Sequence, residues 1–199
     1  MLKKIVIGLI VIVAGFLVVV SRQPSEFKLN RSQKMNAAPK IVFEQVNDFH
    51  KWQVWSPWAK KDPQAKGTFE GAPAGEGAQF SWDGNKEVGA GRMTITESRP
   101  NELIRMNLEF FKPFKAAHNA EFTFTPEGEG TVMSWTMSGK QNFVGKAMCM
   151  FMNMDKMVGG DFEKGLAEIK TISESQAAGE AAVQAAQAQS KPKEKKSKK

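Results

Sequence analysis

The chain has 199 residues, of which 41% are hydrophobic and 25% are charged. This length predicts a single domain with tails, and the apolar content is too high for a generally disordered chain. Most of the formal net charge of +7 comes from basic residues near the two ends of the sequence. A nucleic-acid-binding domain normally keeps its basic patch on the folded part, so the charge pattern argues against a nucleic-acid partner.

The first segment is an apolar run over residues 5–20, flanked by Lys3, Lys4 and Arg22. As a helix this run is about 24 Å long, short of a hydrocarbon core of about 30 Å, and the flanking basic side chains can extend to the two interfaces. We predict a single-pass transmembrane signal-anchor over residues 1–22, with a cytoplasmic N-terminus and an extracytoplasmic domain, periplasmic in a Gram-negative cell. A cleaved signal peptide with a weak cleavage site is the alternative.

The folded part begins with a predicted strand over 27–33. Pro39 suits the first turn of a helix, and apolar residues follow it at helical spacing. We expect this helix to break near Asp48 and a second short helix to carry three tryptophans that lie within seven residues, Trp52, Trp55 and Trp58. Because each tryptophan can bury roughly 150–250 Å², the three predict a packed aromatic wall or the mouth of an apolar pocket.

From Gly67 onward the sequence alternates between apolar and polar residues through six predicted strands, separated by turn signals: 67–71, 77–83, 91–98, 103–111, 118–125 and 131–139. Their short links predict an antiparallel meander. One face carries most of the large apolar side chains, whereas the other carries polar residues such as Glu109 and Glu121. One wet face and one buried face are typical of an antiparallel sheet covered on one side.

A long helix from about Val144 to Ile172 is expected to cover the apolar face of the sheet, and Gly159-Gly160 is expected to kink or interrupt it. Residues 175–199 are an Ala/Gln/Lys-rich low-complexity tail, in which only a marginal helix is expected because no apolar face is present. The Lys-rich end, 191–199, is interpreted as a solvated tail, with contact to anionic lipid head groups as the alternative.

The predicted fold class is therefore α+β with a helix-grip architecture. A curved antiparallel sheet of about seven strands is wrapped around one long C-terminal helix, and two short helices follow the first strand. Any part of the sheet's concave face that side chains do not fill would form a cavity. The predicted organisation is an anchor over 1–22, a domain over 23–174 and a tail over 175–199.

Several segments of residues 25–174 resemble the START-like helix-grip superfamily, SRPBCC, and within it the polyketide cyclase/dehydrase-like group. The resemblance rests on Asn47–Trp52 running into Trp55–Trp58, on Phe80–Asn85, on Gly89–Ile95 and on Met154–Leu166. It implies binding of lipids, sterols, polyketides or plant hormones, with cyclisation catalysed by a minority of members. No catalytic set of such members can be carried over, because fold alone does not transfer activity.

The residues that could carry chemistry are few. Cys149 is the only cysteine, so a disulfide within the chain and a cysteine-rich zinc site are excluded. The two histidines, His50 and His118, lack metal-binding spacing and are interpreted as structural or surface residues. Strand alternation places Glu109 and Glu121 on the wet face, away from a cavity. We predict no cofactor, no metal and no catalytic residue, although a histidine pointing inward would favour an enzyme.

Two further clusters leave alternatives open. Met148, Cys149, Met150, Met152, Met154 and Met157 suit an adaptable apolar wall, with a Cu(I) site as the alternative. The segment 110–115 combines three phenylalanines with two lysines. It is interpreted as a packed corner after a strand, with an interfacial loop at the bilayer or a gate at the cavity mouth as the alternative.

The sequence thus predicts a membrane-tethered domain that binds a hydrophobic or amphipathic small molecule or lipid in an internal cavity, for transport or sensing. The predicted cavity wall consists of Trp55, Trp58, Phe80, Trp82, Met106, Leu108, Phe122, Trp135, Met148 and Met152. A cyclase or dehydratase acting on a polyketide-like substrate and an interaction module without a ligand are the alternatives.

Overall fold

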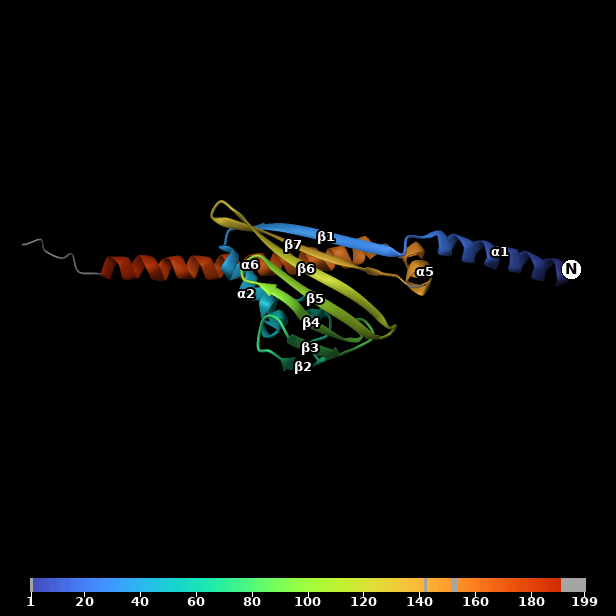
Figure 1. Ribbon diagram of the computed structural model, residues 1–199, viewed down its shortest axis with the longest axis horizontal. Helices are drawn as coiled ribbons and strands as arrows, with labels where there is room; N and C mark the ends of the chain where they lie inside the picture. Colours follow the sequence, from blue (N-terminus) through green and yellow to red (C-terminus); the bar gives the residue numbers. More distant parts are fainter. Residues whose placement is uncertain (1, 142, 152–153, 191–199) are drawn as a thin grey trace, which may run out of the picture.

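The computed structural model describes residues 2–141, 143–151 and 154–190. Within these residues one seven-stranded antiparallel sheet, in the order β1-β7-β6-β5-β4-β3-β2, curves around a long C-terminal helix (Figure 1). Strands β2 to β7 form a meander, and β1 pairs with β7 at the far edge. This arrangement confirms the predicted α+β helix-grip fold.

The strands are β1 (Glu26–Met35), β2 (Lys66–Gly71), β3 (Ala78–Asp83), β4 (Ala90–Arg99), β5 (Leu103–Lys112), β6 (Ala116–Glu127) and β7 (Gly130–Lys140). The helices are α1 (Leu2–Arg22), α2 (Pro39–Asn47), the 3-10 helix η1 (Phe49–Lys51), α3 (Trp52–Trp55), α4 (Pro57–Lys61), α5 (Phe143–Phe151) and α6 (Met154–Ser190). Each predicted strand overlaps an observed strand, with ends that differ by at most two residues.

The tryptophan segment forms three short helical elements instead of one. Asp48 ends α2, and its side chain caps η1 by accepting a hydrogen bond from the backbone N–H of His50 at 2.9 Å. Ser56 is extended because it precedes Pro57, which then occupies the first turn of α4. Proline chemistry therefore divides a segment that spacing alone joins into one helix.

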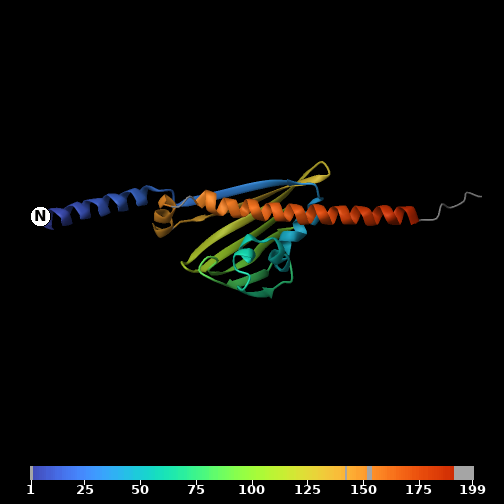
Figure 2. The same cartoon turned by 180° about the vertical axis from the view of Figure 1, so that it is seen from behind.

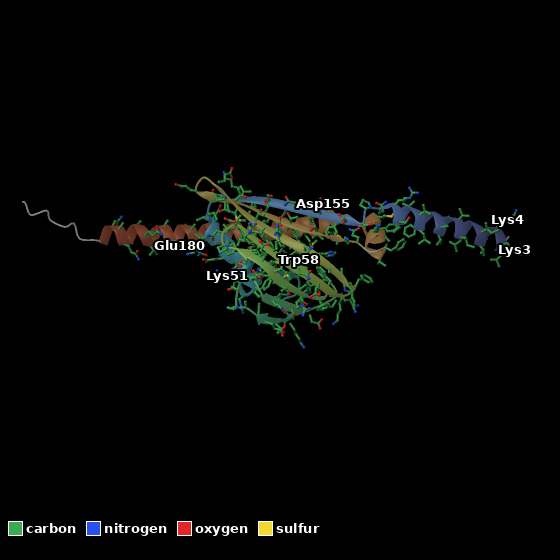
Figure 3. The ribbon with its side chains drawn as sticks, in the orientation of Figure 1. Lys3, Lys4, Lys51, Trp58, Asp155 and Glu180 are labelled. Carbon is green, nitrogen blue, oxygen red and sulfur yellow. The ribbon has the colours of Figure 1, made fainter. Side chains whose placement is uncertain are left out.

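The predicted long helix is two helices in the structure. α5 ends at Phe151, and α6 then runs without interruption through Gly159 and Gly160 to Ser190 (Figure 2). The expectation of a break at the glycine pair is thus wrong. α6 also continues into the segment predicted as a tail, because Ala and Gln propagate a helix that packing has already nucleated. Its last part projects beyond the sheet, where the exposed Glu180 is labelled in Figure 3.

An ion-pair cluster fixes α6 against the edge strand β1. Arg31 donates from Nη2 to Asp155 Oδ2 at 3.0 Å and from Nε to Glu163 Oε1 at 2.7 Å. Asp155, Gly159 and Glu163 lie four residues apart along one row of α6, and a Cβ atom at Gly159 would lie 2.3 Å from Arg31 Nη2. Gly159 therefore lets the guanidinium cross the helix between the two carboxylates.

The core is packed at one end of the grip and loosens toward the other. On β6, Phe122 and Phe124 are buried whereas His118 is half-buried, and on β7, Met133 is buried whereas Met137 is half-buried. The same change occurs along β5, β1 and α6. All of these loosely packed ends lie near α5 and the C-terminal end of α1 (Figure 1). The side chains are therefore packed more densely on the α2 side of the core than beside α5.

Candidate functional site: a pocket at the α5 end of the helix grip

The packed end of the core is an aromatic cluster around Trp135. The ring of Trp135 lies 3.9 Å from that of Phe162, 4.9 Å from that of Phe122 and 5.8 Å from those of Trp55 and Trp58. The indole N–H of Trp55 donates to the carbonyl of Gln45 at 2.9 Å. The cluster therefore joins the sheet, the short helices and α6 through filled space and satisfied hydrogen bonds.

The other predicted wall residues lie elsewhere on the inner face. Phe80 and Trp82 on β3 are half-buried and stack at 6.4 Å, Met106 on β5 is fully buried, and Leu108 is half-buried. The side chains of Met148 and Met152 lie outside the described residues. The structure thus brings Trp55, Trp58, Phe122 and Trp135 into one cluster, places the other four around it, and leaves their role in binding a ligand as a prediction.

A pocket of about 560 Å³ lies at the loosely packed end. It is bounded by the beginnings of β1 and α6, the end of β7, the β5–β6 turn and α5, and the eight described residues of the predicted wall do not line it. Its apolar lining consists of Phe27, Leu29, Phe114, Ala116, Met137, Val144, Gly145 and Val158. Its polar lining consists of Lys28, Lys115, His118, Lys140, Gln141 and Asp155. This volume lies within the range of pockets that hold small organic ligands, about 300–1,000 Å³.

His118 is the ionisable residue of the inner sheet face that borders this pocket. It lies on the same face of β6 as Phe122, pairs across the sheet with Leu108 and Gly139, and meets the ring of Phe27 edge to face at 4.9 Å. Its Nδ1 atom is buried without a hydrogen-bond partner among the described residues. A Cβ atom at position 139 would lie 2.3 Å from Nδ1, so Gly139 makes room for the imidazole.

Burial lowers the pKa of His118 from its ordinary value of 6.5. The backbone of Ala117 raises this pKa, but burial is the larger effect. The imidazole is therefore neutral at pH 7, with one ring nitrogen able to accept a proton or a hydrogen bond. A neutral acceptor inside an apolar pocket can orient a hydroxyl group of a ligand, or act as a general base toward an acidic C–H or O–H group.

The rim of the pocket is positively charged. Lys28, Lys115 and Lys140 are exposed and form no ion pair with another described residue, whereas the rim carboxylate, Asp155, is paired with Arg31. An amphipathic anion would place its apolar part among Phe27, Met137 and Val158 of this pocket and its charged group among the lysines.

A profile of the family described as polyketide cyclase / dehydrase and lipid transport matches residues 26–174. The chain belongs to this family. The match begins at β1 and ends within α6, so it covers the sheet, the aromatic cluster and every element that borders the pocket. It confirms the resemblance to the polyketide cyclase/dehydrase-like SRPBCC proteins and supports a role in ligand binding or in cyclase-type chemistry. No curated protein matches the chain by sequence.

Solved structures share the fold. The di-domain ARO/CYC StfQ from the steffimycin biosynthetic pathway superposes with a TM-score of 0.59 and 13% identity, covering 77% of this chain and 52% of StfQ. A protein from Rhizobium leguminosarum gives a TM-score of 0.55 and 14% identity over 75% of this chain and 95% of its own. A protein from Chromobacterium violaceum gives a TM-score of 0.51 and 16% identity, over 76% of this chain and 99% of its own. At these identities the likeness shows the fold alone.

His50 and the exposed members of the methionine cluster do not line this pocket. His50 is exposed on η1, contacts Asp48 Oδ1 through Nδ1 at 2.8 Å and stacks on Phe69 at 4.1 Å. Among the described residues no group of three or more His, Cys, Asp or Glu side chains could hold a metal. In the methionine cluster, Met150 and Met157 are exposed, and the side chains of Met148, Cys149, Met152 and Met154 lie outside the described part.

Most of the pocket lining was not predicted from the sequence. His118 could have been predicted, because it lies four residues before Phe122 in the same strand and strand alternation therefore places both side chains on the inner face. The contributions of Phe27, Phe114 and Val144 come from a strand start, a turn and a separate helix, and only the closed sheet brings them together.

Proposed function

We propose that this domain binds a hydrophobic or amphipathic molecule, specifically a lipid with an anionic group, in the pocket beside α5. The observation that carries the proposal is a 560 Å³ pocket with apolar walls and three exposed lysines at its rim. Burial of the apolar part of such a ligand contributes about 25 cal/mol per Å². The lysines and His118 orient its polar part, which is the usual division of labour in such sites.

The proposal includes tethering of the domain to a membrane by α1. This helix is a candidate membrane span by length and composition. Two contacts support an uncleaved anchor: Val20 is fully buried, and the ring of Phe16 lies 6.1 Å from that of Phe151 in α5. Lys3 and Lys4 lie at the end of α1 far from the domain (Figure 3). By the positive-inside rule that end is cytoplasmic and the domain is extracytoplasmic. A tethered binder of this kind suits transfer of lipid at one membrane or sensing of it.

The proposal is tested by filling the pocket. Met137→Trp adds a large side chain at the half-buried wall, and Val54→Trp makes the same addition on the exposed surface of α3 as a matched control. Each full-length protein is purified in the same polymer nanodisc, transferred to lipid-free detergent and analysed by native mass spectrometry. A bound lipid is expected on the wild type and on Val54→Trp and not on Met137→Trp. Equal occupancy of all three would refute the pocket.

A second function, a cyclase or dehydratase acting on a polyketide-like substrate, is favoured by one observation. The inward, neutral His118 supplies the general base that such an enzyme needs, and it borders the pocket. His118→Gln separates the two functions, since it removes the base while it keeps a polar side chain of similar size. Conversion of an aromatic polyketide precursor by the wild type and its loss in His118→Gln, with binding retained, would establish catalysis. Binding without conversion by either protein would support the carrier function.

A further inference from the structure

Large apolar side chains are exposed on two neighbouring segments at the pocket mouth. On α5, Phe151 is 77% exposed, and Phe143, Val144 and Met150 are exposed as well. In the β5–β6 turn Phe114 is 57% exposed, and Phe111 near the end of β5 is exposed as well. Soluble proteins rarely expose this many large apolar side chains close together, and an exposed apolar patch of this kind marks an interaction site. Residues 111–115 and 143–151 together form the apolar rim.

The strand register places both segments at the same end of the domain as the anchor. His118 pairs with Gly139, so the start of β6, which follows the turn, lies beside the end of β7, which precedes α5. Glu26 at the start of β1 pairs with Lys140 at the end of β7, and only residues 23–25 separate β1 from α1. Both halves of the apolar rim therefore lie at the end of the sheet at which α1 joins the domain (Figure 1).

The contact between Phe16 and Phe151 sets the depth of α5. Phe16 lies four residues before Val20, the last residue of the apolar run, which corresponds to about 6 Å of helix rise inside that run. Because the ring of Phe151 lies 6.1 Å from that of Phe16, it lies beside the apolar part of α1 rather than beyond it. When α1 spans a bilayer, Phe151 is thus within the hydrocarbon or at its edge.

The charges of the apolar rim fit an anionic membrane surface. Residues 111–115 and 143–151 contain three lysines and no Asp or Glu. Lys112 is paired with Asp83 at 2.9 Å, which leaves Lys115 and Lys146. Lys28 and Lys140 border the same end. Lysine stems can lie along apolar surface with the ammonium group at the lipid phosphates. Each lysine near such a surface contributes about 1 kcal/mol of attraction to anionic lipid.

We propose that the apolar rim docks onto the bilayer surface, in the leaflet where α1 ends, with α5 as an interfacial helix and the β5–β6 turn as a second insertion point. The occupant of the apolar rim is an anionic bilayer. Docking turns the mouth of the pocket, which Phe114 and Val144 line, toward the lipid head groups. The inference rests on the membrane tethering in the proposed function and not on the presence of a pocket ligand.

The experiment measures depth in the bilayer by spin labelling of the full chain in nanodiscs. Nitroxides are placed at Phe114→Cys and Phe151→Cys in a Cys149→Ala background whose melting temperature matches the wild type. Val11→Cys, in the middle of α1, reports whether the anchor is inserted. Glu129→Cys, in the β6–β7 turn at the opposite end of the sheet, is the aqueous control. Accessibility to oxygen, which partitions into lipid, is compared with accessibility to a water-soluble nickel chelate.

Docking predicts that labels at 114 and 151 are accessible to oxygen and protected from nickel, like the label at 11 and unlike that at 129. Replacing one third of a zwitterionic lipid by phosphatidylglycerol is expected to deepen the label at 114. A lipid-like signal at 11 with nickel-accessible labels at 114 and 151 would overturn docking and leave the anchor intact. A nickel-accessible label at 11 would overturn the anchor and docking with it. Labels protected from both reagents, with dipolar broadening between chains, would show a second copy instead of lipid. Pocket occupancy is scored separately with Met137→Trp.

Discussion

Trp135 in β7 and Phe162 in α6 stack with their ring centroids 3.9 Å apart and their planes 8° apart. This contact joins β7, the neighbour of the edge strand β1, to the N-terminal part of α6. On the α2 side of the stack, buried side chains fill the concave face of the sheet. Near α5 the residues of this face are half-buried, and the pocket lies there. Beside the stack, a pocket of about 260 Å³ lies between α4 and α6, and the pocket of about 560 Å³ lies at the α5 end of the domain.

Truncation of Phe162 is therefore expected to act on stability. Phe162→Ala removes a fully buried ring and is expected to lower the free energy of unfolding by about 3–5 kcal/mol. Urea unfolding followed by tryptophan fluorescence measures the loss. Val54→Ala, at an exposed position, is the control and is expected to change stability by less than about 0.5 kcal/mol. Similar stabilities of the two variants would contradict the packed cluster.

The pKa of His118 predicts a dependence of stability on pH. Burial holds this pKa below 6.5 in the folded state, so the unfolded chain takes up a proton first as the pH falls. The contribution of the neutral, buried imidazole to the free energy of unfolding is fully present above pH 6.5. It is lost as the pH falls from 6.5 toward the pKa of the folded state. His118→Gln is expected to flatten this part of the profile, whereas Val54→Ala, an exposed change that removes no titratable group, is expected to leave it unchanged. Urea unfolding between pH 5 and 8 measures both, and parallel profiles for wild type and His118→Gln would refute burial of the imidazole.

The adjacent glycines of α6 provide a matched pair of substitutions. A Cβ atom at Gly160 meets no atom within 4 Å, so Gly160→Ala is expected to stabilise the helix by up to about 1 kcal/mol. At Gly159 the same methyl group would displace the Arg31 guanidinium from Asp155 and Glu163. Gly159→Ala is therefore expected to be less stable than Gly160→Ala. In an Arg31→Gln background the two alanine variants are expected to have equal free energies of unfolding. A persistent difference in stability would show that contact with Arg31 is not its cause.

The proposed membrane anchor predicts an intact N-terminus in the cell. Mass spectrometry of the purified protein is expected to find residues 1–22 retained, because α1 packs on α5. A membrane-impermeant maleimide is expected to label Glu129→Cys, in a Cys149→Ala background, from outside the cytoplasmic membrane. A mature chain that begins near Arg22 would establish a cleaved signal peptide, and labelling only after lysis would reverse the orientation.

The sheet could be predicted from the sequence because local patterns specify it. The alternation around Phe122 and Trp135 sets one face of each strand toward the core, and short turns leave a meander as the simple solution. The ends of the helices were less predictable. Pro57 starts a separate helix, while the cost of Gly159 is offset by the contact that it permits with Arg31, a residue more than a hundred positions away in the chain.

The candidate site was less predictable than the fold. Large aromatic residues are equally suited to a filled core and to a cavity wall, and only the packing distances show that Trp55 and Trp135 belong to a filled cluster. The pocket lies where the large side chains end, beside Met137 and His118. A pocket of this kind depends on how far α5 and the β5–β6 turn stand from α6, which no local pattern encodes.

The most direct test of the account is photo-crosslinking with a diazirine-bearing fatty acid, followed by identification of the modified residues by peptide mass spectrometry. The full-length wild type is expected to carry the label on inward residues of the pocket, Met137 and Val158, in addition to lipid-facing residues of α1. Met137→Trp is expected to lose the pocket label and keep that on α1. Label confined to α1 in the wild type, or the same pocket label in Met137→Trp, would contradict a lipid-binding pocket at the α5 end of the grip.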